Sequence, residues 1–141
     1  MKLYIGSDHG GYELKHYLIS KFKEAEFIDV GHKDYDKKDG YPEIAHQLAE
    51  KVLADDQGLG VLICGSGLGM SMAANRHQGI RAAICTSVKL AKLARQHNNA
   101  NILCLGGRII SKGKALSILK KFVKTKFEGG RHGQRVEAIE L

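Results

Sequence analysis

Short apolar runs alternate along this chain with longer segments in which apolar residues recur every three or four positions. The first pattern is typical of buried strands and the second of amphipathic helices. The runs predict five strands, at residues 2–6, 27–30, 59–63, 80–84 and 102–105. Strands that alternate with helices through short connections indicate a single α/β domain, residues 1–141. We expect a Rossmann-like three-layer sandwich with a five-stranded parallel sheet and a C-terminal helical tail.

The helices between these strands have recognisable starts and apolar faces. Pro42, the only proline, suits the first turn of the helix that follows the second strand. Thr86 or Ser87 can cap the helix before the fifth strand, and Ser111 can cap the last long helix. The apolar stripe predicted for that last helix consists of Ala115, Leu116, Leu119, Phe122 and Val123.

The third predicted strand runs into a glycine-rich turn, residues 64–71, which begins with a thiol. Small residues suit a tight turn into a helix, and this places Cys64 at the carboxyl end of the strand. Backbone N–H groups at the start of such a helix have no partner within it and can bind an oxyanion or a phosphate. A nucleophile or base beside an anion cradle is a catalytic arrangement.

Other interpretations of this turn compete with the catalytic one. Cys64 could be an inert core thiol, because cysteine is among the most buried residue types. A dinucleotide fingerprint requires glycine at position 70, which is Met, and an acid about twenty residues later, where residues 85–87 offer none. No Gly-Lys-Ser/Thr sequence is present, which excludes a nucleotide P-loop.

Polar residues follow other predicted strands as well. Asp8 and His9 come after the first strand and Arg108 after the fifth. Because ligands of open α/β sheets bind at the carboxyl ends of the strands, these side chains should share one rim with Cys64. Asp8 could instead only cap the helix that follows it.

His97 and Asn98 do not fit this rim, because they follow a helix rather than a strand. They should lie at the opposite rim of their own subunit. His97 could therefore complete the site only across a subunit contact, which predicts a dimer with shared active sites. The asparagines of segment 97–101 could also serve only to tolerate left-handed backbone angles.

The composition limits the class of protein. Hydrophobic residues make up 43% and charged residues 26% of the chain, as in soluble globular domains. No apolar run approaches the roughly twenty residues of a membrane span and no signal-peptide pattern is present, so we expect a cytoplasmic protein. Cys64, Cys85 and Cys104 form no CxxC pair, which argues against a disulfide framework or a zinc site.

The net charge of +7 is concentrated in residues 108–141, where nine Lys or Arg face three Glu, giving +6. The lysines of this segment could meet an anion or form the solvated face of one helix. No basic patch is interleaved with aromatic residues, so a nucleic-acid partner is the weakest interpretation. Arg131 and Arg135 would share one face of a helical tail, and their planar guanidinium groups suit a phosphate.

The chain contains Gly-Ser-Asp-His-Gly-Gly at 6–11, Cys-Gly-Ser-Gly-Leu-Gly-Met-Ser at 64–71, Ala-Ala-Asn at 73–75, Gly-Ile-Arg-Ala at 79–82, Arg-Gln-His-Asn-Asn-Ala-Asn at 95–101 and Glu-Gly-Gly-Arg-His-Gly-Gln-Arg-Val at 128–136. Together and in this order, these segments resemble the type B ribose-5-phosphate isomerases. Each segment is short, but the joint pattern is specific and spans nearly the whole chain.

The resemblance implies an aldose–ketose isomerase that acts on a small sugar phosphate through an enediolate and needs no metal or organic cofactor. Cys64 matches the family's base, and Ser66 would assist proton transfer at the substrate oxygens. His97 matches the residue that opens the sugar ring, a task suited to an imidazole near neutral pH. Asn98 would orient the substrate, and Asp8 would contact its hydroxyl groups.

Anion binding is also implied by the resemblance. His9, Arg131 and Arg135 match phosphate-binding positions, with Arg108 as a further candidate. Backbone N–H groups of the glycine turn would form the oxyanion hole for the enediolate; the turn's candidates are Gly65, Gly67, Gly69 and Met70. The resemblance also implies a homodimer, possibly a tetramer. A dimer agrees with the expectation that His97 lies at the opposite rim of its own subunit from Cys64.

Several alternatives stay open. The sugar could be allose or galactose phosphate, because discrimination between hydroxyl groups depends on the width of the pocket. One subunit of galactose-6-phosphate isomerase lacks the cysteine and the other lacks the His-Asn pair, whereas this chain has both. A sugar-phosphate-binding module without chemistry is the alternative from a different class.

Overall fold

The computed structural model describes residues 1–31 and 35–141. Five parallel strands form one sheet in the order β2-β1-β3-β5-β4. The strands are β1 Lys2–Ser7, β2 Glu26–Asp29, β3 Gly60–Cys64, β4 Ala82–Ile84 and β5 Ile102–Gly106. The predicted five-stranded parallel sheet is confirmed.

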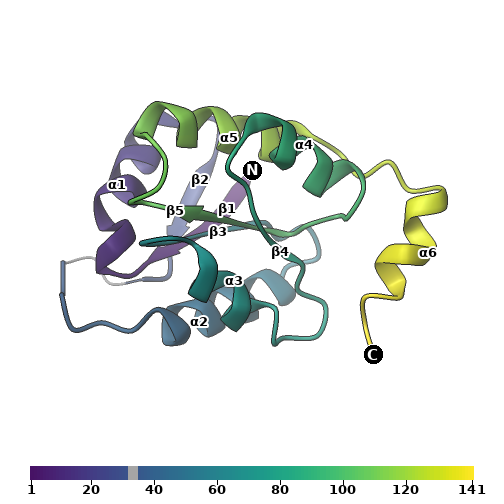
Figure 1. Cartoon of the computed structure of the whole chain (residues 1–141), viewed down its shortest axis with the longest axis horizontal. Helices are drawn as coiled ribbons and strands as arrows, with labels where there is room; N and C mark the ends of the chain where they lie inside the picture. Colours follow the sequence, from purple (N-terminus) through teal and green to yellow (C-terminus); the bar gives the residue numbers. More distant parts are fainter. Residues whose placement is uncertain (32–34) are drawn as a thin grey trace.

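Helices cover both faces of the sheet (Figure 1). In that view the upper layer holds α1 Tyr12–Lys21, α4 Val88–Gln96 and α5 Lys112–Lys124, and the lower layer holds α2 Tyr41–Leu53 and α3 Leu68–Ala74. A short helix, α6 Arg131–Glu137, stands beside the sheet at the end opposite α1. This is the expected three-layer sandwich with a helical tail. No helix of the described residues is long and apolar enough to cross a membrane.

Side chains that alternate along each strand divide the core into two parts. In β3, Val61 and Ile63 point into the upper core, against residues of α1 and α5, whereas Leu62 and Cys64 point into the lower core, against α2 and α3. All five residues of β3 are buried, as expected of the central strand of a parallel sheet. The thiol of Cys64 therefore lies on the lower side.

Two predicted caps are confirmed and some boundaries differ. The Ser87 and Ser111 hydroxyls accept hydrogen bonds from the N–H groups of Leu90 and Lys114. β4 starts at residue 82 rather than 80. The apolar pattern also gave no sign that the side chain of Lys15 in α1 is fully buried. Its Nζ lies 2.9 Å from Asp29 Oδ2.

The chain connections diverge on both sides of the carboxyl end of β3. Chain leaving β1 and β5 goes to the upper helices α1 and α5, whereas chain leaving β3 goes to the lower helix α3 (Figure 1). Because β1 and β5 are the two neighbours of β3, the loops part on both sides of its carboxyl end. Ligands of open α/β sheets bind where neighbouring connections diverge in this way.

Candidate active site

Cys64 is the last residue of β3 and lies at the floor of a hollow of about 500 Å³. Only 5% of the residue is exposed. We call this space the carboxyl-end hollow; it is lined by Asp8, Tyr41, Cys64, Gly65, Ser66, Gly69, Arg108 and Ile109. Asp8, Ser66 and Arg108, which follow β1, β3 and β5, thus line one hollow together with this largely buried thiol.

The turn after Cys64 folds its amides back toward the sulfur. The N–H of Gly67 donates to Cys64 Sγ at 3.1 Å, and the N–H of Leu68 donates to Ser66 Oγ at 3.2 Å. Gly67 has φ of +85°, a conformation that disfavours any residue with a Cβ. The turn therefore aims a backbone N–H at the sulfur.

Further amides of this turn remain available to a ligand. Those of Gly69 and Met70 have no acceptor among the residues that the structure describes, whereas the N–H of Ser71 donates to the carbonyl of Gly67. Gly69 lines the carboxyl-end hollow. The side chain of Met70 is fully buried in the lower core, so any contact of Met70 with substrate has to use its backbone.

Three loops touch one another around the thiol. A Cβ at Gly10 would lie 2.8 Å from the nitrogen of Gly65, and one at Gly107 would lie 2.5 Å from the carbonyl oxygen of Gly10. The N–H of Gly107 donates to the carbonyl of Cys64 at 2.8 Å. The side chain of Arg108 lies over Gly65, with Nη1 3.2 Å from the position of a Cβ there. The loops after β1, β3 and β5 therefore form one compact unit.

Asp8 is buried at the edge of this unit, with 7% exposure. Its Oδ1 accepts the N–H of Gly10 at 2.9 Å and caps the 3-10 turn η1, His9–Gly11. The alternative that Asp8 caps the following helix holds for η1, which leads directly into α1, whereas α1 itself begins after Gly11 without a side-chain cap. Burial raises the pKa of the Asp8 carboxyl, an effect that the Gly10 N–H partly offsets and the charge of Asp39 reinforces.

α6, which contains Arg131 and Arg135, lies at the other end of the sheet (Figure 1). His97 and Asn98 stand between α4 and the amino end of β5. His97 is the C-cap of α4, and its ring stacks on that of His132 in α6, with centroids 4.2 Å apart and planes at 12°. Burial and the neighbouring His97 lower the pKa of His132. The predicted opposite rim of His97 is thus confirmed: within one chain it cannot reach Cys64.

The asparagines around His97 have separate tasks. Asn99 has φ of +47°, the left-handed conformation that was considered for this segment. Its carbonyl accepts from Arg81 Nε, and the side chain of Asn101 bridges the N–H of Arg81 and the carbonyl of Gly79. Asn98 is exposed. Asn99 and Asn101 shape the turn and Asn98 is the one available to a ligand.

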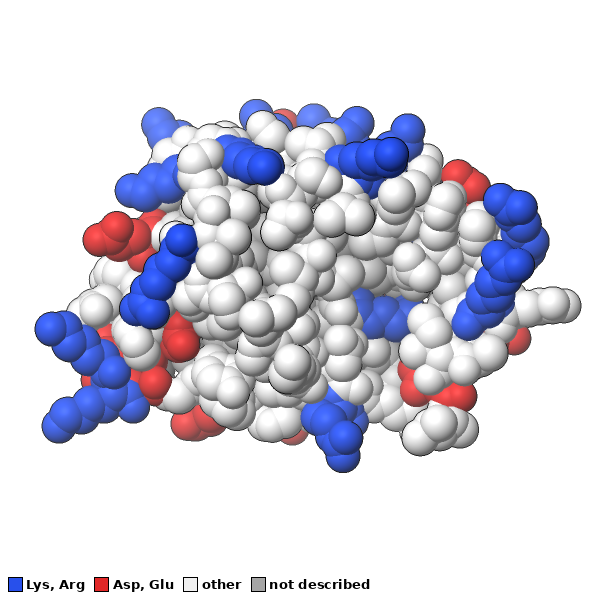
Figure 2. All heavy atoms as spheres, in the orientation of Figure 1, with Lys and Arg blue, Asp and Glu red and all other residues white. Residues whose placement is uncertain are grey.

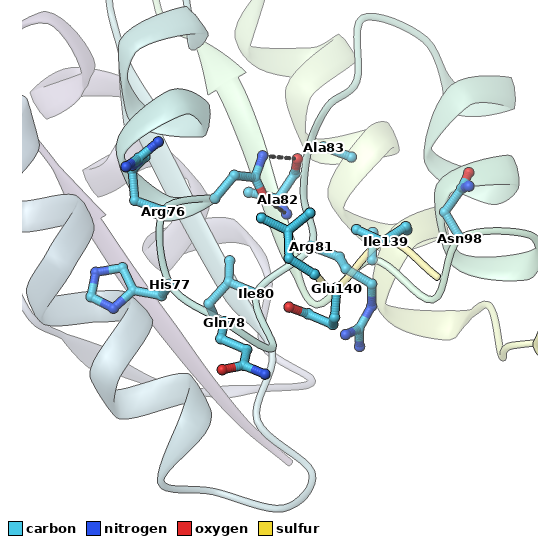
Figure 3. A pocket seen from close by; sticks show the side chains of 13 residues that line it. Arg76, His77, Gln78, Ile80, Arg81, Ala82, Ala83, Asn98, Ile139 and Glu140 are labelled. Carbon is cyan, nitrogen blue, oxygen red and sulfur yellow. Dashed lines mark hydrogen bonds between the residues drawn. The ribbon is translucent and has the colours of Figure 1, made fainter. Parts of the chain in front are cut away.

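A second, larger hollow of about 630 Å³ lies at this end, and we call it the amino-end hollow. Figure 3 shows Asn98 on one side, Arg76 and His77 on the other, and Arg81 beside Glu140. Ile139, Glu140 and Leu141 also line it. Asn98 lines this hollow, but neither Cys64 nor His97 does, so Cys64 and His97 do not share a hollow of one chain.

The remaining candidates have structural explanations. The six lysines of residues 112–126 are exposed, and Figure 2 shows Lys and Arg along the upper edge of the molecule as well as on other parts of this face. They form a solvated face. All three cysteines are free. Burial raises the pKa of Cys85 to about 11 and raises that of Cys104 as well, so both stay protonated at neutral pH.

Among the described residues, two groups of side chains come close enough to share a metal ion: Asp8, His9 and Asp39, and His97, Glu128 and His132. Hydrogen bonds, ring stacking and ion pairs within the two groups account for the short distances between these side chains. Asp39 is hydrogen-bonded to His9, and His132 stacks on His97 while its Nε2 lies 3.8 Å from Glu128.

Residues 3–139 match the family described as Ribose/Galactose Isomerase. The chain belongs to this family. It is 42% identical to a ribose-5-phosphate isomerase B of Escherichia coli, a match that covers 98% of this chain and 93% of the relative. The solved structure of the Thermotoga maritima ribose 5-phosphate isomerase superposes with a TM-score of 0.94 at 44% identity, covering 99% of this chain and 97% of that one.

A further solved relative carries a ligand. The Mycoplasma genitalium ribose-5-phosphate isomerase B was crystallised with bound ribulose-5-phosphate; it matches with a TM-score of 0.92 at 43% identity over 98% of this chain and 93% of that one. Fold and family are therefore shown together over almost the whole chain.

The sequence analysis missed three residues near the carboxyl-end hollow. Tyr41 and Ile109 line it, and the ring of Tyr41 covers Gly69 so closely that no Cβ would fit there. Asp39 holds the ring of His9. Tyr41 stands beside Pro42 and could have been noticed as an aromatic side chain at a helix start. No local pattern marks Asp39.

Proposed function

We propose that this chain interconverts ribose 5-phosphate and ribulose 5-phosphate. The observation that supports this most is the thiol of Cys64, which ends the central strand, lines the carboxyl-end hollow and receives the N–H of Gly67 beside unpaired amides. The similarity to ribose-5-phosphate isomerases over nearly the whole chain supports the choice of sugar. The reaction needs a base and an oxyanion site, which this thiol and these amides would supply.

The proton transfer takes place on the open-chain sugar. The Cys64 thiolate takes the proton from C2, and the electrons of that bond form a C1–C2 double bond while the negative charge develops on O1. Backbone N–H groups of the turn, those of Gly65, Gly69 and Met70 among them, hold that oxygen. Ser66 assists the transfer of the O2 proton to O1. Cys64 then returns its proton to C1, and O2 becomes the ketone oxygen.

Ring opening is assigned to His97, which would take the proton of the O1 hydroxyl and return one to the ring oxygen. His97 must come from a second copy of the chain, since it lies at the opposite end of its own sheet. A two-fold dimer can place the carboxyl end of each chain beside the amino end of its partner. Asn98 of the same turn would then orient the sugar, and Asp8 would contact its hydroxyl groups from the first chain.

The surface supports such a homodimer. Leu68 and Met72 are exposed at 53% and 68% on α3 and Ile109 is 62% exposed at the hollow, while Ile139 is 51% exposed at the other end. Exposed apolar side chains at both ends fit an interface that joins the ends. His9 and Arg108 from one chain and Arg131 and Arg135 from its partner would hold the phosphate.

A phosphorylated sugar does not cross membranes, which supports a cytoplasmic location. The chemistry uses protein groups alone and calls for no metal or organic cofactor.

The test is to incubate the purified protein with ribose 5-phosphate and follow ribulose 5-phosphate by NMR. Allose 6-phosphate and galactose 6-phosphate run in parallel. We expect the highest kcat/KM on ribose 5-phosphate. A preference for either hexose phosphate would reassign the substrate, and turnover of none of the three would refute the isomerase.

Modification of Cys64 by iodoacetamide separates an enzyme from a binding module. A catalytic thiolate should react quickly at neutral pH and be protected by ribose 5-phosphate. Slow labelling that the sugar does not affect would favour a module that binds without chemistry.

A further inference from the structure

We propose that Asp39 is a positioning residue that fixes the imidazole of His9 for phosphate binding. This inference rests on the proposed function, because it assigns a task to the same site. The evidence is a two-point contact between residues 30 positions apart: Asp39 Oδ1 lies 3.0 Å from the backbone nitrogen of His9 and 2.8 Å from its ring Nδ1.

Burial separates the roles of the two side chains. The side chain of Asp39 is 3% exposed, whereas that of His9 is 28% exposed. Asp39 therefore does not face the solvent from which a substrate arrives, and His9 does. The carboxylate acts on a ligand only through the ring that it holds.

The contact determines which ring nitrogen is available. Because Asp39 Oδ1 occupies Nδ1, the nitrogen left for a phosphate oxygen is Nε2. A phosphate that binds there places the ring between the carboxylate of Asp39 and the phosphate, with one ring nitrogen toward each. The backbone contact to His9 N adds a second constraint, so that the main chain is held as well as the ring.

A ring held in this way loses less entropy on binding the phosphate than a freely rotating one. His9 also follows Asp8 directly, and Asp8 lines the carboxyl-end hollow. A shift of His9 would move the end of η1, whose Gly10 packs on Gly65. Asp39 thus connects the loop before α2 to the loop after β1.

The test compares Asp39→Ala and Asp39→Asn with the wild type. We expect Asp39→Ala to raise the KM for ribose 5-phosphate and the dissociation constant of inorganic phosphate about tenfold, with kcat changed less than about threefold, as fits the loss of one charge-assisted hydrogen bond. Asp39→Asn keeps an acceptor oxygen without the charge, and we expect an increase of about threefold.

The matched control is Asp36→Ala, which removes an exposed carboxylate of the same loop that accepts the N–H of Lys38. This control variant should change neither the KM for ribose 5-phosphate nor the dissociation constant of inorganic phosphate. His9→Ala combined with Asp39→Ala should be no worse than His9→Ala alone, because residues acting through one contact are not additive.

Different results separate the two proposals. Asp39→Ala could instead lower kcat and the melting temperature and leave phosphate binding unchanged. This result would show that Asp39 only holds the loop in place. Phosphate binding by calorimetry does not depend on turnover. A wild type that fails to isomerise any sugar but loses phosphate affinity in Asp39→Ala would refute the proposed reaction and support the positioning role.

Discussion

The two ends of the sheet are built in opposite ways. At the carboxyl end, backbone contacts among three loops fix Cys64 and Asp8, which are 5% and 7% exposed. At the amino end, Asn98, Arg131 and Arg135 are exposed on helix ends, and His97 is half-buried against His132. The first end offers a thiol with amides around it, and the second offers a further imidazole and two further guanidinium groups but no thiol. The proposed reaction uses groups from both ends.

Replacement of Cys64 by Ala should have the largest effect, because it removes the base from the carboxyl end. We expect kcat to fall about a thousandfold, within the range for loss of a general base. The assay is the conversion of ribose 5-phosphate followed by NMR.

Cys85→Ala is the matched control, since Cys85 is equally buried but lies in the upper core. It should keep nearly full activity in the folded protein. If the Cys64 variant retained most of its activity, the base would have to be another group.

Mixing two inactive variants tests whether the ends act across chains. Cys64→Ala and His97→Ala chains, unfolded together and refolded in equal amounts, should recover about a quarter of the wild-type activity, because half the dimers are mixed and one of their two sites is intact. Each variant refolded alone is the control. No recovery by the mixture, with dimers formed, would contradict the shared site.

Loss of a cation at the amino end should have a smaller effect. We expect Arg135→Ala to raise the KM for ribose 5-phosphate about tenfold with little change in kcat, because one charge-assisted phosphate contact is lost. Lys120→Ala, on the solvated face of α5, should leave both constants unchanged. Steady-state kinetics at fixed ionic strength distinguish the two, and an equal response of both variants would indicate general electrostatic attraction instead.

The smallest expected effect concerns Asp8. Since burial raises its pKa, the folded state binds the proton more tightly than the unfolded state, and the ionised carboxyl costs stability at pH values above this raised pKa. The cost disappears as the pH falls through it. Asp8→Asn keeps the acceptor for the Gly10 N–H, so we expect its melting temperature to be about 2 °C higher at pH 7 and the gain to shrink toward pH 4.

Thermal unfolding of Asp8→Asn and the wild type at both pH values measures this difference. A variant less stable than the wild type at pH 7 would contradict it. Activity should fall all the same, because the carboxylate is assigned to the sugar hydroxyls.

Much of the carboxyl end was predictable, because its residues follow strands whose apolar runs are unmistakable. Cys64 and Asp8 were placed by counting from the strands, and His97 was placed at the other end by the same logic. Asp39 and the burial of Lys15 were not predictable. Their partners, His9 and Asp29, depend on contacts between segments distant in sequence, and a lysine in an amphipathic helix ordinarily faces water.

Met70 shows a further limit of a motif. The sequence placed its backbone N–H within the anion cradle but did not reveal that its side chain packs in the lower core. A motif gives the order of residues, whereas the rotation of α3 decides which side chains reach the hollow. Rotation follows from packing, which adjacent residues do not reveal.

The contact between the backbones at Gly10, Gly65 and Gly107 limits how this protein can diversify. A methyl group at Gly10 or Gly107 would force the loops apart, so substitutions there should impair the protein whichever sugar phosphate it binds. Tyr41 and Ile109, exposed at 40% and 62%, have no such restriction. An engineer who wishes to change sugar preference should randomise those two positions and leave the glycines alone.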